Sequence, residues 1–310
     1  MFVVCGEALM DVFAAGDTVC GMALDARVGG SPFNVAVGLA RLGQPVAFFS
    51  AVSRDFLGER LMRALVAEGV HTSSVQRDDA PTTLGLVGLD ANRVPSYSFY
   101  GERCADRRLS ADALDSLPNG ISAIHLGSYA TVVEPIASTL RALVEREHAR
   151  TLVAFDPNIR LNVEPDLARW RDTLEWMLPR SHLLKISEED LQLLLPGTSL
   201  QVFAANALSR GVKLLVVTRG AEGCVAWTPQ VHASVPSVQV KVIDSVGAGD
   251  TFQAALLTWL SEHGSLGAAA LHTLSASQLG SALAFAARAA AITCSRRGAD
   301  MPRRSEVRAS

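Results

Sequence analysis

The sequence predicts an α/β fold with a doubly wound, mostly parallel sheet, and two observations indicate it. Short apolar segments alternate with amphipathic helical segments along most of the 310 residues, and this alternation produces right-handed crossovers between parallel strands. Hydrophobic residues make up 49% of the chain and charged residues 19%, which is typical of a well-buried globular protein. We expect one α/β domain over residues 1–310 that carries a small accessory piece.

The elements of this domain follow from apolar periodicity and from glycine and proline positions. The first expected strand covers residues 2–5, and Asp11 follows at its carboxyl end, the edge where open α/β sheets bind ligands. A helix is expected over 33–42, with Ser31 as N-cap and Gly43 as its stop. Further strands are expected at 46–52, 72–77, 121–126, 151–155, 182–186 and 212–217, and further helices at 56–68, 134–147, 166–177, 188–195, 200–210 and 276–291. Antiparallel pieces are expected at 223–227 and 231–242, and the basic tail from Arg303 is expected to be loosely held.

Two segments interrupt the alternation of strands and helices. Residues 12–26 alternate weakly between small polar and apolar positions, and residues 82–100 resemble a hairpin around Asp90–Arg93. We therefore predict a small β-sheet lid formed by about 12–26 and 82–104 and inserted in the domain. Such a lid closes over a ligand or joins two copies into a homodimer.

Composition excludes several classes of partner. The net charge of −3 provides no basic surface for nucleic acid. No apolar run has the length of a membrane span, and the N-terminus lacks the basic region of a signal peptide. The five cysteines are scattered, without any C-x-x-C pair, which suits a reducing cytoplasm. We expect a cytoplasmic protein that binds small molecules.

The stretch Asp244–Phe252 contains the strongest chemical signal. Gly247 and Gly249 flank Ala248, and an apolar run with helical spacing follows at once. The turn therefore opens onto a helix N-terminus, where unpaired N–H groups attract anions. Asp250 lies at this junction, where a carboxylate takes a proton from a hydroxyl while the N–H groups hold a phosphoryl group. Taken alone, the stretch also suits an ordinary capped helix.

Two fingerprints are absent from the sequence. There is no G-x-x-x-x-G-K-[ST] loop, and no G-x-G-x-x-G follows the first strand. P-loop kinases and dinucleotide-dependent dehydrogenases are thereby excluded.

A second motif agrees with the first. The chain contains two segments that resemble the two signatures of the ribokinase-like, or phosphofructokinase B, carbohydrate kinases. The first is Gly29-Gly30-x-x-x-Asn34-x-Ala36, continued to Gly43, and the second is Asp244–Phe252. Landmarks between them fall in the family's order across nearly the whole chain: Asp55–Gly58, Phe155–Arg160, Lys185–Asp190, Thr218–Gly223 and Arg296–Ala299. The resemblance implies a ribokinase-like fold and an ATP- and Mg²⁺-dependent sugar kinase.

The resemblance also implies roles for individual residues. Asp250 is similar to the family's general base, and the N–H groups of Gly247, Ala248 and Gly249 to its anion hole. The implied sugar-binding residues are Asp11, Gly30, Asn34, Asn158, Arg160, Tyr100 and Arg107. The implied nucleotide-binding residues are Lys185, Thr218, Gly220 and Gly223.

The metal ligands depart from the family pattern. Ser187-Glu-Glu-Asp190 stands where many relatives carry Asn-x-x-Glu, so Glu188 and Asp190 are the implied carboxylates for Mg²⁺. Asp244 resembles part of the monovalent-cation site of some relatives, which implies K⁺.

The likeness within the family is greatest to bacterial fructokinases. The segments that indicate it are Pro81–Asp90, Ser96–Glu102, Ala105–Arg107, Asp156–Arg160 and Cys294–Ala299. We expect conversion of fructose to fructose 6-phosphate. The alternatives are 2-keto-3-deoxygluconate kinase, then ribokinase or nucleoside kinase. A non-catalytic sugar- or nucleotide-binding regulator on the same scaffold is an alternative of another class.

Overall fold

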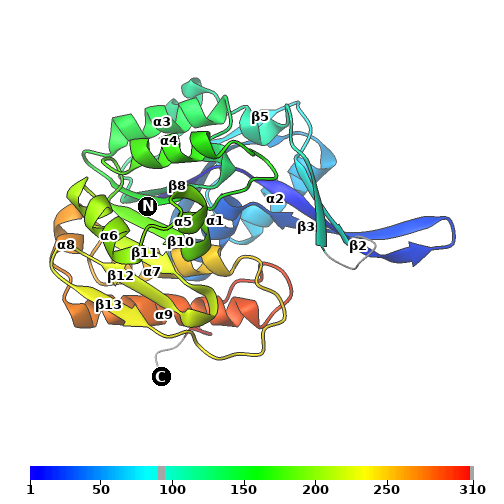
Figure 1. Cartoon of the computed structure of the whole chain (residues 1–310). Helices are drawn as coiled ribbons and strands as arrows, with labels where there is room; N and C mark the ends of the chain where they lie inside the picture. Colours follow the sequence, from blue (N-terminus) through cyan, green and yellow to red (C-terminus); the bar gives the residue numbers. More distant parts are fainter. Residues whose placement is uncertain (90–94, 308–310) are drawn as a thin grey trace.

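A nine-stranded sheet forms the centre of the computed structural model, which describes residues 1–89 and 95–307 (Figure 1). The strand order is β13-β12-β11-β10-β9-β8-β1-β4-β5. The seven strands from β11 to β5 pair in parallel, and β12 and β13 pair antiparallel at one edge. The strands are β1 (Phe2–Cys5), β4 (Val46–Ser53), β5 (Val75–Asp78), β8 (Ala123–Gly127), β9 (Leu152–Asp156), β10 (Leu183–Ser187), β11 (Leu214–Thr218), β12 (Cys224–Trp227) and β13 (His232–Val235).

Helices cover both faces of this sheet, as predicted. The α-helices are α1 (Ser31–Arg41), α2 (Phe56–Ala67), α3 (Ile136–Glu147), α4 (Leu167–Met177), α5 (Glu188–Leu194), α6 (Leu200–Ser209), α7 (Ala248–Glu262), α8 (Ala268–His272) and α9 (Ala276–Cys294). Alternate residues of β1 enter different cores: Phe2 and Val4 pack with α1, α7 and α9, whereas Val3 and Cys5 pack with α3, α4 and α6. This is the period-two burial of a strand covered on both sides.

A second, smaller sheet comes from the two segments from which a lid is predicted. Its order is β3-β2-β6-β7, with β2 (Leu9–Thr18), β3 (Gly21–Gly29), β6 (Leu84–Leu89) and β7 (Pro95–Tyr100). The β2–β3 hairpin projects away from the body (Figure 1). The predicted turn at 90–93 lies outside the described residues. We call this sheet the lid.

Four details differ from the sequence-based expectation. Asp11 does not end the first strand, because β1 stops at Cys5 and Asp11 belongs to β2 of the lid. The last strand is only His232–Val235, since Pro236 lacks the N–H that would extend the pairing. A short helix, α8, was not expected.

The tail is the fourth difference: its described residues, 303–307, are held and not loose. Val307 is fully buried in the core, and Arg304 donates to both carboxylate oxygens of Glu262, at 2.9 and 3.0 Å. Among the described residues, no helix combines the length and the apolarity needed to cross a bilayer.

Candidate active site

The N-terminus of α7 is built on glycines that no other residue replaces easily. Gly247 is the N-cap in left-handed backbone, with φ 76, and a Cβ there would lie 2.6 Å from the Cβ of Ala299. A Cβ at Gly249 would lie 3.1 Å from Lys185 Nζ. The turn therefore brings backbone N–H groups and a lysine ammonium to one point.

Two of the three predicted anion-hole donors are free within the described residues. The Ala248 N–H donates to the Ser245 carbonyl at 3.2 Å, which closes the turn. The N–H groups of Gly247 and Gly249 have no acceptor within residues 1–89 and 95–307. Such orphan donors at a helix N-terminus suit an anion.

Asp250 lies in the first turn of α7 and is held from α1. Its side chain is buried, and its Oδ1 accepts a hydrogen bond from Ser31 Oγ at 2.7 Å. Its Oδ2 accepts one from Asn34 Nδ2 at 2.8 Å. Burial raises the pKa of Asp250, whereas these two bonds and the charges of Lys185 and Arg160 lower it. The carboxylate is thus fixed in orientation and is a suitable base.

This geometry corrects the N-cap that the sequence predicts for α1. Gly30, with φ 105, is the N-cap of α1, so Ser31 is the first helical residue and its hydroxyl serves Asp250 instead of the helix end. A Cβ at Gly30 would come 2.8 Å from the Glu7 carbonyl oxygen, so glycine is needed here for close backbone approach. Asn34 is buried and donates to Asp250.

Asp11 is carried to the site by the lid. Its carboxylate lies between Gly29 and Gly85: a Cβ at Gly29 would overlap Oδ2, and one at Gly85 would lie 3.0 Å from Oδ1. Burial raises the pKa of Asp11 to about 6, with the charge of Arg160 lowering it and that of Asp250 raising it. Asp11, Asp250 and Arg160 therefore lie near enough to influence one another.

A buried ion pair lies beside the anion hole. Lys185 Nζ is 2.7 Å from Asp156 Oδ2, and both side chains are almost fully buried. Within the described part of the chain, Asp156 Oδ1 has no hydrogen-bond partner. Burial raises the pKa of Asp190 to about 6, helped by the Asp156 charge and opposed by Lys185. Asp156 was present in a predicted motif but not among the predicted site residues, because no spacing rule pairs it with Lys185.

The residues after β9 extend toward this group. Asn158 has φ 42, an uncommon conformation for a residue other than glycine. Arg160 Nη1 donates to the Ile159 carbonyl at 2.9 Å, and the described chain offers Arg160 no ion pair. Its exposed guanidinium nevertheless influences the carboxylates of Asp11, Asp190 and Asp250.

The predicted metal residues differ in their surroundings. Glu188 forms an ion pair with Arg219 at 3.3 Å, whereas Asp190 adjoins Asp156 and Lys185. No group of three or more His, Cys, Asp or Glu side chains arranged for a metal occurs in the described chain. Magnesium that arrives with ATP needs only one or two carboxylates, and the unpartnered Asp156 Oδ1 together with Asp190 fits that requirement.

The predicted nucleotide residues lie beyond β11. Thr218 ends that strand opposite Ser187. Gly220 has φ 52 and open space around it, as close ligand approach would need. Gly223 has φ 90 and packs against the carbonyl of Val235, so its glycine is also required by the sheet edge.

Asp244 supports the loop behind the anion hole. Its Oδ1 accepts from the Val246 N–H at 3.0 Å and its Oδ2 from the Gly298 N–H at 2.8 Å. The cation role predicted for Asp244 stays a prediction.

The two remaining predicted sugar residues are placed by the lid strand β7. Residues paired across neighbouring strands lie on the same face of a sheet. Asp11 pairs with Gly85, which pairs with Phe99, so these three share one face. Tyr100 pairs with Leu84, the next residue along each strand. Tyr100 therefore points to the opposite face of the lid from Asp11, with its side chain 59% exposed. Arg107 lies with its guanidinium 5.9 Å from the ring centres of both Phe99 and Tyr129.

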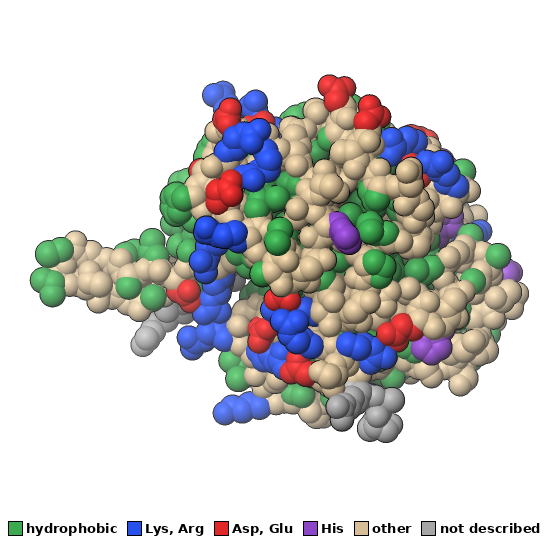
Figure 2. Space-filling view, turned by 180° about the vertical axis from the view of Figure 1, so that it is seen from behind, with side chains coloured by type: hydrophobic (Ala, Val, Ile, Leu, Met, Phe, Trp, Pro, Cys, Tyr) green, Lys and Arg blue, Asp and Glu red, His purple; other side chains and the backbone are tan. Residues whose placement is uncertain are grey.

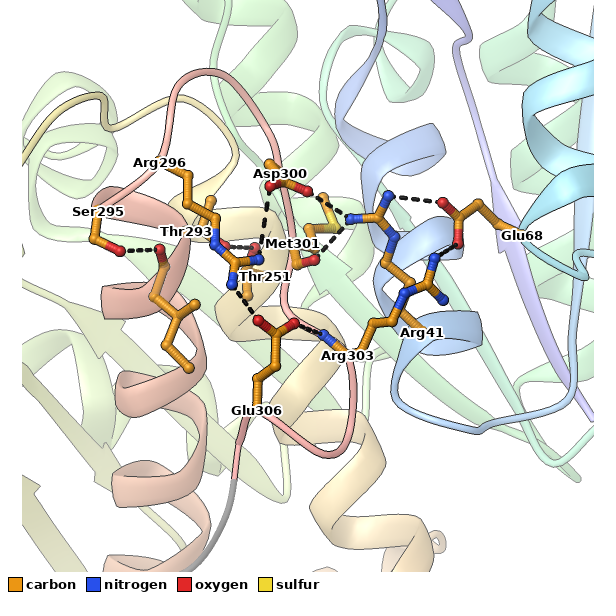
Figure 3. A network of polar contacts seen from close by, with 11 residues as sticks. Arg41, Glu68, Thr251, Thr293, Ser295, Arg296, Asp300, Met301, Arg303 and Glu306 are labelled. Carbon is orange, nitrogen blue, oxygen red and sulfur yellow. Dashed lines mark hydrogen bonds and ion pairs between the residues drawn. The ribbon is translucent and has the colours of Figure 1, made fainter.

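A network of ion pairs braces the helices that carry the site (Figure 3). Arg41, at the end of α1, contacts Asp300 at 2.9 Å and Glu68 at 2.7 Å. Thr251, next to the predicted base, shares a hydrogen bond of 2.8 Å with Thr293 of α9. The tail and its loop thus hold α1 and α7 in the alignment that joins Asn34 to Asp250.

The fold and the site together define a class: an enzyme that transfers a phosphoryl group to a hydroxyl without a P-loop. The comparisons agree. The chain belongs to the pfkB family of carbohydrate kinases, whose family model matches residues 1–305.

Individual relatives point the same way. The chain is 36% identical to a fructokinase of Rhizobium leguminosarum bv. trifolii over 84% of this chain and 79% of the relative. It is 34% identical to fructokinase-1 of Zea mays over 81% of this chain and 80% of the relative.

Solved structures extend the likeness to the whole fold. A fructokinase from Xylella fastidiosa with bound ATP has TM-score 0.88 and 29% identity, covering 99% of this chain and 96% of the other. A fructokinase from Vibrio cholerae O395 in a fructose-, ADP- and calcium-bound form has TM-score 0.79 and 26% identity, covering 96% and 94%.

Proposed function

We propose that this chain is an ATP-dependent fructokinase that phosphorylates the C6 hydroxyl of fructose. The observation that carries the proposal is the buried Asp250 carboxylate, fixed by Ser31 and Asn34 beside the free N–H groups of Gly247 and Gly249. A fixed base next to an anion hole is what hydroxyl phosphorylation needs. The similar proteins named fructokinase support the choice of sugar.

The sugar binds, in this proposal, between the lid and the N-terminus of α1. Asp11, the Gly30 backbone and Asn34 hold its hydroxyl groups, since a carboxylate that accepts two hydroxyl hydrogens fixes a polyol in one orientation. Asn158 and Arg160 close the side toward the phosphate. Closure of the lid over the sugar excludes water, which favours transfer over hydrolysis.

Asp250 then accepts the proton of the sugar hydroxyl. The hydroxyl oxygen attacks the γ-phosphorus of ATP, the bond from that phosphorus to the bridging oxygen breaks, and ADP leaves. The N–H groups at the start of α7 bind the oxygens of the transferred group, and Lys185 and Arg160 offset their negative charge. ATP extends from there past Thr218, Gly220 and Gly223.

Asp190 and Asp156 are the residues that would hold Mg²⁺, directly or through water. Bound there, the ion would offset negative charge on the phosphates of ATP. Glu188 is less suited to this role because Arg219 already pairs with it. A K⁺ ion at Asp244 would lie beside the loop that supports the anion hole, and a Vibrio cholerae fructokinase structure contains a potassium ion.

ADP release measured with purified protein and Mg·ATP tests the proposal. Fructose, 2-keto-3-deoxygluconate, ribose and adenosine are compared with buffer alone. We expect turnover with fructose to exceed turnover with each other acceptor by at least tenfold. Preference for another acceptor would show that the substrate is that acceptor and not fructose. Binding of fructose without turnover would favour a non-catalytic sugar-binding regulator.

The lid also supports a homodimer. The exposed apolar side chains of Met22, Leu24 and Tyr100 share the face of the lid opposite Asp11, and Val19 extends them at the tip. Exposed apolar side chains on one face of the lid suit contact with a second copy. Sedimentation velocity should give a dimer that Met22→Glu dissociates and that the control Val202→Glu, on exposed α6, does not. A monomeric wild type would contradict this arrangement.

A further inference from the structure

A basic groove lies where the lid joins the body. Its volume is about 480 Å³, and strand β3 lines one side with Asp25–Val28 while α2 lines the other with Arg60, Arg63 and Ala64. In the space-filling view, Lys and Arg side chains gather in a row at the root of the projecting lid (Figure 2). Three arginines and one aspartate therefore line the groove.

Two of these guanidinium groups are not neutralised by the protein. Asp25 accepts a hydrogen bond from Arg27 Nε at 2.9 Å, so its negative charge is already paired with Arg27. The acids on and just after α2 are also occupied, because Glu59 pairs with Arg77 and Glu68 with Arg41 and Arg303. Within residues 1–89 and 95–307, Arg60 and Arg63 have no ion pair or hydrogen bond.

The groove is connected to the candidate active site through Arg27. Register pairs Arg27 of β3 with Asp11 of β2, so both side chains lie on the same face of the lid. Arg27 Nη1 also packs on Gly298, where a Cβ would lie 2.8 Å away, and the adjacent Ala299 packs on Gly247 of the anion hole. A ligand that spans the groove from Arg60 and Arg63 to the Asp25–Arg27 pair therefore acts on the strand pair that positions Asp11.

We propose that this groove binds a small phosphorylated molecule, which ties the lid to α2. Guanidinium groups bind phosphate oxygens in pairs of hydrogen bonds, and a phosphate monoester or diphosphate supplies the two negative charges that Arg60 and Arg63 lack. The volume falls within the range of small-molecule sites. The site is separate from the anion hole, whose donors belong to α7. Binding is expected to lower the KM for the sugar, and this consequence alone depends on the proposed function.

Calorimetric titration tests the binding directly. Inorganic pyrophosphate is added to protein whose catalytic site is filled with fructose and a non-hydrolysable ATP analogue with Mg²⁺, at fixed salt. We expect one further site in the wild type, weakened at least tenfold in Arg60→Gln/Arg63→Gln. The control Arg150→Gln/Arg210→Gln removes the same charge from two ion-paired arginines that follow the ends of α3 and α6 and do not line the groove, and it should retain wild-type affinity. Equal affinity in both double variants, or no further site in the wild type, would overturn the proposal.

Separate titrations distinguish the sources of the phosphate. Fructose 6-phosphate and AMP are compared with pyrophosphate, and the ligand that binds most tightly identifies a sugar or a nucleotide phosphate. The binding measurement remains valid even if fructose is not the substrate. The link to the lid would be refuted if the ligand shifted the KM for fructose equally in the wild type and in Arg60→Gln/Arg63→Gln.

Discussion

Replacement of Asp250 by Asn changes the proposed base while preserving its shape. The carboxylate accepts one hydrogen bond from Ser31 and one from Asn34, at 2.7 and 2.8 Å. The amide oxygen of the variant still accepts from Ser31, but its NH₂ group faces the NH₂ group of Asn34. One hydrogen bond is lost, at a cost of about 1 kcal/mol.

This cost is offset by the removal of a buried charge. Burial raises the pKa of Asp250, so its ionised form is disfavoured in the folded protein, and a neutral amide avoids that penalty. The free energy of unfolding should therefore change by no more than about 1 kcal/mol. Catalysis loses its proton acceptor, and kcat should fall about 10²- to 10⁴-fold, equivalent to about 3 to 5 kcal/mol in the barrier.

Three measurements separate these effects: kcat from ADP release, unfolding in urea, and calorimetric binding of ATP. Asp112→Asn, the same chemical change at an exposed position, is the matched control and should leave all three unchanged. A variant at position 250 that keeps more than a tenth of wild-type kcat would refute the role of the carboxylate. A variant that unfolds would refute the energetic reasoning.

Three further predictions follow from the same contacts. Ser31→Ala removes one bond to Asp250 and keeps the base, so kcat should fall about tenfold at unchanged ATP affinity. Burial raises the pKa of Glu7 to about 8, so the folded protein binds a proton there that the unfolded chain releases above about pH 4.3. The free energy of unfolding, measured in urea, should therefore fall as the pH rises to about 8. Glu7→Gln should remove about 1.4 kcal/mol of that decline per pH unit. Lys185→Met leaves Asp156 buried and unpaired, at about 3 to 5 kcal/mol of unfolding free energy, and adding Asp156→Leu should restore part of it.

Each of these outcomes has a clear opposite. An unchanged kcat in the Ser31 variant would mean that Asn34 alone orients the base. Parallel stability curves for wild type and Glu7→Gln would mean that the Glu7 carboxyl is ionised in the folded protein at neutral pH. Equal stability of the Lys185 single and double variants would mean that Asp156 is solvated once the lysine is removed.

The main sheet and its helices could be predicted because the signals are local. Apolar runs bounded by glycine and proline mark the strands, and helical spacing marks the segments between them. The limits of the short antiparallel edge were less predictable, because Pro236 ends β13 although apolar alternation continues beyond it. The tail looked free because the sequence does not show that Glu262 and the core receive it.

The site was predicted in part, since its contacts join distant parts of the chain. The motifs indicated both Asn34 and Asp250, but not that a hydrogen bond connects residues 216 positions apart. Ser31 was assigned to a helix cap because Ser before Pro suits that position, and only the packing of α1 on α7 shows its other partner. The face on which Tyr100 lies depends on the register of β7 with β6, which no local pattern determines.

The most direct test of the central claim is to identify the product. Fructose labelled with ¹³C is incubated with Mg·ATP and the protein, and carbon and phosphorus NMR spectra show which carbon acquires the phosphate. The account predicts coupling of phosphorus to C6 in the wild type and, over the same reaction time, about 10²- to 10⁴-fold slower formation of the phosphorylated sugar with Asp250→Asn. Phosphate on C1, or recovery of free fructose from the wild-type reaction, would contradict it.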